Sequence, residues 1–344
     1  MQNLKIDWVS SDTFPKKGEL KAFGTFVCGG GSTMGYKLAG FDHLGGVEID
    51  KNMADIYETN HIPKYFYKED IRVFNERKDL PNELYELDVL DGSPPCSTFS
   101  MAGSREKSWG KEKQFREGQS KQCLDELVYV YCDTIKKLQP KVAILENVTG
   151  IVSGKAKKYT IGIYDKLEKA GYYVQIFKLN AATMGVPQAR ERIFFIARRK
   201  DLGFEPLVLK FNEKPVYFGD IADTGSTTHK EMLNSTKLRW KYVTKGDESL
   251  KYANRIYTNN PDSHSFFSTS IVYNNTVHGT LTSGGTSVYY HEERRLNDTE
   301  YRRMSTFPKD FDFRNVNVRY VCGMSVPPLM IARIANEIKK QWFE

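Results

Sequence analysis

Short apolar runs alternate with longer amphipathic segments over the first 200 residues of the chain. The runs are bounded by Gly, Asp or Pro, as buried strands commonly are. They predict strands at residues 22–27, 45–49, 87–90, 142–145, 173–179 and 193–197. Apolar residues recur at three- and four-residue steps at 53–57, 124–138 and 159–170, which predicts helices with one buried face. This alternation is typical of an α/β domain with a doubly wound, mixed but mostly parallel sheet.

The pattern changes after about residue 201. Ser, Thr, Asn, Tyr and Phe become frequent, apolar periodicity is weak, and turn signals such as Asn259-Asn260-Pro261-Asp262 recur. Helical spacing returns at 325–343. We therefore predict a first domain at 1–202, a smaller loop-rich domain at 203–304, and a C-terminal segment at 305–344 that packs back onto the first domain.

Composition narrows the class of protein only a little. A chain of 344 residues with 40% hydrophobic content can bury one large core, and its net charge of +7 suits a polyanionic partner without requiring one. The five cysteines form no CxxC pair and the six histidines show no ligand spacing, so we predict free thiols and no metal site. No stretch reaches the ~20 apolar residues of a membrane span, so we expect a cytoplasmic protein with no membrane partner.

A glycine-rich turn at 26–35 stands between the first predicted strand and a helix. Glycines allow a ligand to approach the backbone closely at this edge of a doubly wound sheet. Glu48 follows the next strand, where an acid can accept both hydroxyls of a ribose, and Asp70 follows the next unit. The pattern indicates an adenosine-containing cofactor; the alternative is a tight turn beside solvated acids.

Cys96 directly follows two prolines after the predicted strand at 87–90. Proline fixes the backbone, so a stiff loop would hold the thiol in place, which suits a nucleophile. A buried structural cysteine is the alternative, because free cysteine is among the most buried residues.

Two polar segments lie beside the predicted central strands. Glu146 emerges at the end of the run 142–145, where partial burial raises the pKa of a carboxyl group and lets it hold a proton near neutral pH. Alternation would place Gln188, Arg190 and Arg192 on one side of an extended segment. Two guanidinium groups on one face can hold a phosphate and a base carbonyl. The alternatives are that Glu146 is an exposed acid at the end of a strand and that residues 188–192 form a solvated edge strand.

Taken in order, these blocks resemble the cytosine carbon-5 DNA methyltransferases over nearly the whole chain. The matching segments are 26–35, Glu48, Asp70-Ile71, Pro95-Cys96, 146–148, 188–192, 294–300 with Phe307-Pro308, and 323–327. One short motif is weak evidence, but eight in the family's order are strong. The resemblance implies a Rossmann-like class I methyltransferase domain with a second, smaller target-recognition domain, and it identifies the chain as a DNA (cytosine-5-)-methyltransferase.

The resemblance also implies a mechanism. Cys96 would add to carbon-6 of a flipped-out cytosine, and Glu146 would bond ring nitrogen 3 and the exocyclic amine. Arg192 would contact the base carbonyl, and Arg190 would steady the nucleotide or the surroundings of Cys96. S-adenosyl-L-methionine would donate the methyl group and leave as S-adenosyl-L-homocysteine.

The other site residues follow from the same resemblance. The residues expected at the cofactor are Phe26, Gly30, Gly31, Glu48, Ile49, Asp70, Ile71, Pro95, Leu127, Met324 and Ser325. Those expected at DNA are Ser100, Arg105, Lys107, Gln188 and Arg295, and the basic segment 101–123 matches the family's mobile loop over DNA. Its alternative is a solvated surface loop.

The chain departs from the family at three positions of the cofactor pocket. Cys28 stands where the family often has glycine, Ile49 where an aromatic residue often stacks on adenine, and Met324 where asparagine is usual. We therefore predict weaker or altered cofactor affinity.

Three other functions remain open from the sequence: a transfer-RNA cytosine-5 methyltransferase, a catalytically silent DNA-binding relative and a dinucleotide-dependent oxidoreductase. The length of the 203–304 region favours DNA, because a sequence reader needs surface to reach several base edges. We expect a bacterial or phage-encoded monomer that acts on double-stranded DNA, alone or with a cognate restriction endonuclease.

Overall fold

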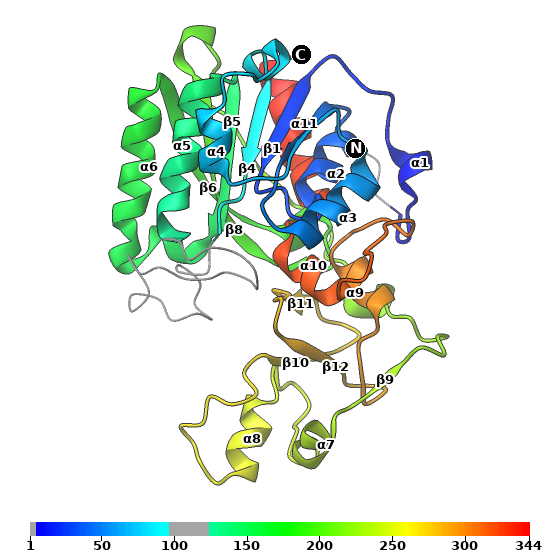
Figure 1. Cartoon of the computed structure of the whole chain (residues 1–344). Helices are drawn as coiled ribbons and strands as arrows, with labels where there is room; N and C mark the ends of the chain where they lie inside the picture. The colour runs from blue at the N-terminus through cyan, green and yellow to red at the C-terminus, as the bar shows by residue number, and fades with distance from the viewer. Residues whose placement is uncertain (1–4, 96–123) are drawn as a thin grey trace.

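The computed structural model describes residues 5–95 and 124–344, and its largest feature is a seven-stranded sheet (Figure 1). The strand order is β3-β2-β1-β4-β5-β8-β6. Six strands run parallel and β8 runs antiparallel between β5 and β6. The strands are β1 (Lys21–Thr25), β2 (Asp42–Val47), β3 (Tyr65–Tyr67), β4 (Val89–Gly92), β5 (Val142–Val148), β6 (Tyr172–Asn180) and β8 (Glu191–Arg199).

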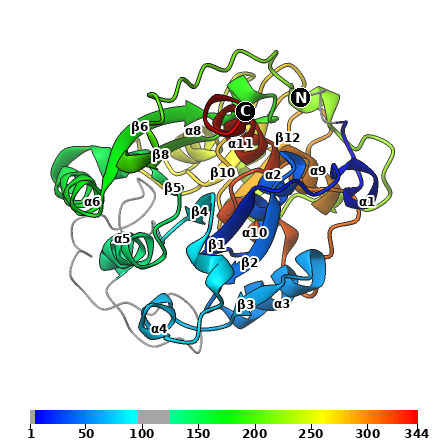
Figure 2. The ribbon, with the colours of Figure 1, turned by 90° about the horizontal axis from the view of Figure 1, so that it is seen from above.

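Helices cover both faces of this sheet (Figure 2). The first face carries α4 (Ile71–Glu76), α5 (Leu127–Leu138) and α6 (Lys157–Lys169), and the opposite face carries α2 (Gly31–Leu38), α3 (Lys51–His61) and α11 (Pro328–Trp342). A short helix, α1 (Ser10–Thr13), precedes β1. The inner strands β1, β2, β4, β5 and β8 are almost entirely buried because both faces of the sheet are covered, whereas the edge strands β3 and β6 are partly exposed.

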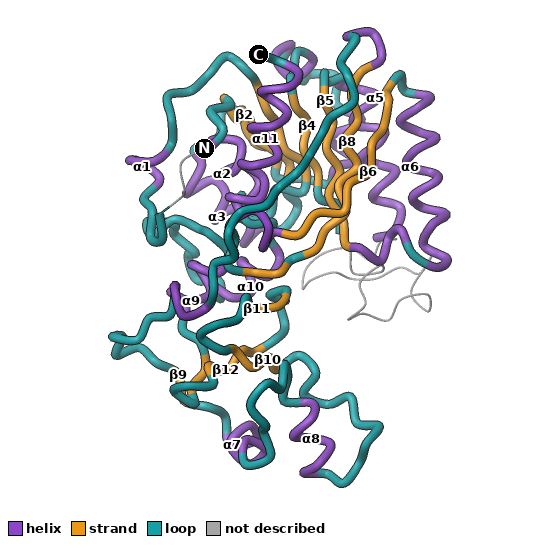
Figure 3. Tube along the Cα trace, turned by 180° about the vertical axis from the view of Figure 1, so that it is seen from behind, coloured by secondary structure: helices purple, strands orange, loops and turns teal. Residues whose placement is uncertain are grey.

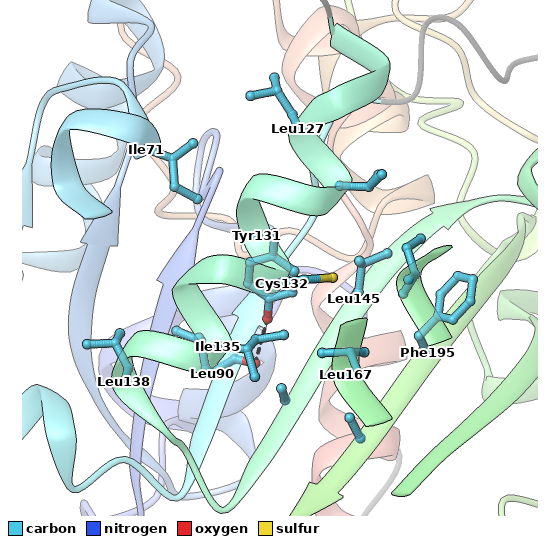
Figure 4. Close-up of a cluster of buried hydrophobic side chains, with 14 of the residues drawn as sticks. Ile71, Leu90, Leu127, Tyr131, Cys132, Ile135, Leu138, Leu145, Leu167 and Phe195 are labelled. Carbon is cyan, nitrogen blue, oxygen red and sulfur yellow. Dashed lines mark hydrogen bonds between the residues drawn. The ribbon is translucent and has the colours of Figure 1, made fainter. Parts of the chain in front are cut away.

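The core between the sheet and α5 contains one polar anchor. Tyr131 is fully buried, and its hydroxyl donates to the carbonyl of Leu90 at 2.9 Å (Figure 4). It also donates to the carbonyl of Ile144 at 2.8 Å. These two bonds tie α5 to the two central strands β4 and β5, which carry the site at their carboxyl ends.

A smaller group of elements lies below the large sheet in the views of Figures 1 and 3. It has a four-stranded sheet in the order β10-β12-β13-β9. Its elements are β9 (Lys230–Glu231), α7 (Asn234–Trp240), α8 (Lys251–Tyr257), β10 (Thr269–Val272), β12 (Thr286–Tyr289) and β13 (Arg294–Arg295). Helices α9 (Asp298–Met304) and α10 (Val318–Met324) lie between it and the large sheet, and β7 (Gln188–Ala189) pairs in parallel with β11 (His278–Gly279).

The predicted doubly wound α/β architecture is confirmed. Each of the six predicted strands overlaps a strand of the large sheet, and the three predicted helices overlap α3, α5 and α6. The C-terminal helix α11 packs on the sheet beside α2. Strand β3 was not predicted, because its three half-buried residues form no apolar run. None of the helices in the described ranges has both the length and the hydrophobicity that crossing a bilayer requires.

Candidate active site at the carboxyl edge of the sheet

The polar residues singled out in the sequence converge on one edge of the large sheet. Parallel strands present their carboxyl ends together, and β8, which runs the other way, begins at the same edge. The features that meet there are the turn 26–31 after β1, Glu48 after β2, Asp70 after β3, Pro94 and Pro95 after β4, Glu146 in β5 and Arg192 in β8.

Glu146 and Arg192 form a buried ion pair. The Nε of Arg192 lies 2.9 Å from Oε1 of Glu146, and the two residues are 9% and 8% exposed. Arg192 stands opposite Val148 in the antiparallel pair of β5 and β8, one diagonal step from Glu146. A second guanidinium nitrogen donates to the carbonyl of Glu191 at 2.7 Å. The carboxylate and guanidinium are therefore held in fixed orientations at the edge, as preorganised chemistry requires.

Asn147 links this pair to the segment that leads to Cys96. It is fully buried, its side-chain oxygen accepts from the backbone N–H of Val148 at 2.9 Å, and its amide donates to the Pro94 carbonyl at 3.4 Å. The prolines beyond β4 are thus held against the end of β5. Cys96 itself lies outside the described residues. Sequence reasoning gave Asn147 no role, although its place beside Glu146 was a usable signal.

Gln188 and Arg190 are buried rather than presented to a ligand. Gln188 is fully buried; its oxygen accepts from the Leu281 N–H at 3.0 Å and its amide donates to the Met304 carbonyl at 3.4 Å. Arg190 donates to the carbonyls of Leu281 and Gly323, each at 3.2 Å. Both side chains therefore join the strand that carries Arg192 to distant parts of the chain. The geometry gives no support to a direct DNA contact by Gln188.

The turn after β1 is held by Glu48. One oxygen of that carboxylate accepts from the backbone N–H of Cys28 at 2.8 Å and the other from the N–H of Asp50 at 2.8 Å. Glu48, at the end of β2, therefore fixes this turn.

Close approach by the protein itself explains the two glycines expected at the cofactor. A Cβ on Gly30, where φ is +88°, would lie 2.0 Å from Nε2 of His61. One on Gly31 would lie 2.4 Å from the carbonyl oxygen of Val326 and 3.0 Å from the Cβ of Ser325. These glycines let α3 and the C-terminal segment close around the turn. A role of Gly30 and Gly31 at the cofactor stays a prediction.

Cys28 occupies a left-handed backbone conformation, with φ of +50°. Glycine adopts this conformation freely, whereas a β-branched residue is strongly disfavoured in it. The backbone strain of a non-glycine residue in this conformation costs roughly 1–3 kcal/mol. We expect Cys28→Gly to change the free energy of unfolding by less than about 1 kcal/mol, because relief of strain offsets the lost side chain. Cys28→Val should lower it by about 1–3 kcal/mol.

Urea unfolding of the two variants and the unsubstituted protein checks this expectation. Cys132→Val is the matched control, because Cys132 is a buried cysteine inside the regular helix α5. Equal losses in Cys28→Val and Cys132→Val would show that backbone strain at position 28 is not the cause.

The remaining residues expected at the cofactor differ in their surroundings. Asp70 caps α4 by accepting from the Arg72 N–H at 2.8 Å, whereas Ile49 is 39% exposed beside the end of β2. Ser325 is 5% exposed, and its hydroxyl is buried without a partner among the described residues. Phe26, Met324 and Pro95 are partly buried, and Ile71 and Leu127 belong to the core between the sheet and α4, α5 and α6.

Only some of the residues expected at DNA lie in the described part of the chain. Ser100, Arg105 and Lys107 lie outside the described residues. Arg295 lies in β13 of the small sheet, where its Nε donates to the Glu231 carbonyl at 2.7 Å. The structure therefore does not bring Arg295 into contact with the pair Glu146–Arg192, and its role at DNA stays a prediction.

Asp91 is a second acid of the site that sequence reasoning passed over. It is 4% exposed in β4, and the Tyr36 hydroxyl donates to its Oδ1 at 3.1 Å. Burial raises the pKa of Asp91 to about 7; the Tyr36 hydrogen bond opposes the shift and the charge of Glu146 adds to it. An aspartate within the run that precedes two prolines was a visible signal.

The sheet order, the antiparallel β8 and the polar edge around Glu146 define a class I, Rossmann-like methyltransferase. The sequence model described as C-5 cytosine-specific DNA methylase matches residues 21–340, and the chain belongs to this family. The expected DNA (cytosine-5-)-methyltransferase class is therefore confirmed, with DNA as the substrate class.

Individual relatives agree with this assignment. The chain is 28% identical to the type II methyltransferase M1.HphI of Haemophilus parahaemolyticus over 92% of its own length and 85% of the relative's. It is 27% identical to the type II methyltransferase M.NgoPII of Neisseria gonorrhoeae, over 93% and 96% of the two chains. A putative DNA modification methyltransferase encoded within an Escherichia coli prophage shares the fold, with a TM-score of 0.72 and 19% identity over 95% of this chain and all of that one.

Proposed function

We propose that the protein transfers a methyl group from S-adenosyl-L-methionine to carbon-5 of a cytosine flipped out of duplex DNA, through a covalent adduct of Cys96. The buried pair Glu146–Arg192 carries the proposal, because it fixes an acid and a cation beside the segment that leads to Cys96. Cytosine carbon-5 is a weak nucleophile. Addition of a thiolate at carbon-6 pushes electrons into the ring and makes carbon-5 reactive.

The residues present fit the cofactor. The hydroxyl of Ser325 is buried without a partner in the described part of the chain, and it stands beside Gly31 at the turn. Glu48 stands at the end of β2, where an acid can bind ribose hydroxyls, and Ile49 offers an exposed apolar surface for an adenine ring. When bound there, S-adenosyl-L-methionine supplies an electrophilic methyl group on a sulfonium sulfur.

The chain's own residues would handle the charge and the protons of the reaction. Attack by the Cys96 thiolate places negative charge on the ring, and Glu146 stabilises it by holding a proton at ring nitrogen 3. Arg192 orients Glu146 and offers its remaining N–H groups to the base carbonyl. Loss of the carbon-5 proton to water, with cleavage of the carbon-6–sulfur bond and departure of Cys96 as a thiolate, then restores the aromatic ring.

None of these groups can reach a stacked base, so the target must leave the duplex at a cost of roughly a few kcal/mol. We propose that residues 203–304 read the sequence around it. The β7–β11 pairing and the bonds from Gln188 and Arg190 to Leu281 support this assignment, because they fix that region against the strand bearing Arg192. Phosphate contacts by the basic segment 101–123 would help to offset the extrusion cost.

Trapping of the covalent adduct tests the proposal. The protein is incubated with tritiated S-adenosyl-L-methionine and duplexes whose cytosines are replaced by 5-fluorocytosine. Fluorine cannot leave as a proton does, so we expect a denaturant-stable complex of protein and DNA that carries the label. Cys96→Ser should form none.

The substrates in the trapping experiment separate the alternatives. An adduct with 5-fluorocytosine transfer RNA and none with any duplex would assign the enzyme to RNA. An adduct that survives Cys96→Ser would overturn the covalent role of that residue. Bisulfite mapping of methylated genomic DNA would then give the recognition sequence.

We also propose a type II setting, in which the enzyme acts as a monomer and protects DNA from a cognate restriction endonuclease. The names of the bacterial relatives support this, and the prophage source of the structural relative supports a solitary phage enzyme as the other setting.

A further inference from the structure

Strand β5 leads directly into a basic turn, residues 153–158, at the carboxyl edge of the large sheet. The strand ends at Val148, which lies in register with Arg192. Two short 3₁₀ turns follow, η4 (Thr149–Val152) and η5 (Gly154–Ala156), and α6 begins directly after them. The basic turn therefore stands beside the site, on the side of the sheet where α5 and α6 pack against each other (Figure 1).

The core beneath the basic turn holds it in place. Ile151 and Ala156 are buried in the core between the sheet and α4, α5 and α6. The Ser153 hydroxyl donates to the Gly150 carbonyl at 3.0 Å, and the Thr160 hydroxyl of α6 donates to the Ile151 carbonyl at 2.9 Å. These contacts fix the backbone, so the side chains that the turn exposes have a defined place at the edge.

The long side chains exposed on the basic turn are lysines. Lys155, Lys157 and Lys158 are all exposed, and the sequence has no acidic residue from 147 to 164. The far end of α6 is different, because two acids there accompany two lysines: Asp165, Lys166, Glu168 and Lys169. Positive charge along α6 is thus concentrated at the end that adjoins the site.

A phosphate backbone has the charge that complements this turn. Duplex DNA carries one negative charge per ~1.7 Å of its axis, and lysines that neutralise phosphates release condensed counterions. A duplex whose flipped cytosine reaches the pair Glu146–Arg192 must lie against this edge of the sheet. The phosphates beside the target nucleotide then pass close to the loops that leave the edge, and the basic turn is one of these loops.

We propose that Lys155, Lys157 and Lys158 bind backbone phosphates of the duplex beside the flipped cytosine. The inference rests on the proposed function, because it takes the place of the duplex from the pair Glu146–Arg192. Lysine binds a phosphate as a point charge, and such a contact reads no base edge. The basic turn thus supplies affinity and orientation on the duplex, and discrimination between sequences is left to residues 203–304.

The salt dependence of duplex binding tests the proposal. The turn variant, Lys155→Gln/Lys157→Gln/Lys158→Gln, removes three charges and should fold normally, because all three side chains are exposed. Anisotropy of a labelled duplex titrated with the whole protein between 50 and 200 mM salt gives the slope of log K against log salt. Each lost phosphate contact reduces the slope by about 0.9, so we expect it to become less negative by about 2–3. The affinity at 100 mM salt should fall by at least about tenfold.

A matched control separates phosphate binding from a general effect of charge. Lys136→Gln/Lys166→Gln/Lys169→Gln removes the same number of charges from the last turns of α5 and α6, at the end away from the site. This far-end variant should change the slope much less than the turn variant. Its melting temperature and that of the turn variant, compared with the unsubstituted protein, show that both are folded.

Two duplexes separate a phosphate contact from sequence reading. One contains the mapped recognition sequence, and in the other that sequence is scrambled. Phosphates are common to all sequences, so the turn variant should lose affinity for both duplexes by the same factor and keep the ratio between them.

The outcomes judge this inference separately from the proposed function. A slope reduced in the turn variant and nearly unchanged in the far-end variant supports it. An unchanged slope, an equal change in both variants or a loss confined to the mapped sequence would overturn it. A change seen with transfer RNA and with neither duplex would overturn the choice of DNA. A protein that binds the duplexes but methylates no cytosine would refute the proposed function, and the slopes would still report whether the lysines bind phosphates.

Discussion

Replacing Glu146 by glutamine should reduce methyl transfer by about 10²–10⁴-fold, the contribution of a positioned general acid. Glutamine keeps the shape of the side chain and one hydrogen-bond acceptor toward Arg192, but it cannot hold an exchangeable proton at ring nitrogen 3. The measurement is single-turnover transfer of tritiated methyl groups to a duplex that contains the mapped site. Binding of the duplex should change far less than the rate.

Variants at Arg192 distinguish chemistry from folding. Arg192→Met leaves the buried Glu146 charge without its partner, and breaking such a pair costs about 3–5 kcal/mol of stability. The double variant Glu146→Gln/Arg192→Met removes both charges, so it should regain most of that stability and none of the activity. Substantial methylation by Glu146→Gln in a normally folded protein would contradict the role given to this residue.

The large sheet was predictable because its strands and helices carry their own periodicity. Runs such as 142–145 are apolar on both faces, as a central parallel strand must be, and residues 159–170 repeat at helical steps. The small sheet was not predictable strand by strand. Strands β9 and β13 have two residues each, and their pairing depends on contacts between distant segments.

The candidate site was predictable in its residue types but not in its pairings. Glu146 and Arg192 are 46 positions apart, and only the antiparallel register of β5 and β8 brings them to 2.9 Å. Alternation placed Gln188, Arg190 and Arg192 on one side of an extended segment, but it gave no sign that the partners of Gln188 and Arg190 would be carbonyl and N–H groups of residues 281, 304 and 323. Tertiary hydrogen bonds of this kind leave no local pattern.

The block at 294–300 contains a second buried ion pair, and it carries the second large prediction. Two guanidinium nitrogens of Arg294 donate to the two oxygens of Glu300 at 2.8 and 2.9 Å, and Glu300 is fully buried. The same oxygens accept from the backbone N–H groups of Asn297 and Asp223. One carboxylate therefore joins β13, the start of α9 and the segment entering the small sheet.

Glu300→Ala should lower the free energy of unfolding by about 3–5 kcal/mol, because it removes the fully buried partner of Arg294, which then keeps, in the described part of the chain, only its ion pair with Glu292, and half of the capping box with Asn297. Arg294→Met/Glu300→Leu should regain much of the loss, since neither charge remains buried. Asp298→Ala, which breaks the exposed pair with Lys230, should cost no more than about 1 kcal/mol. Urea unfolding measures all three. A Glu300→Ala variant as stable as Asp298→Ala would mean that the pair does not organise this region, and the link between β13 and α9 would then rest on their apolar contacts alone.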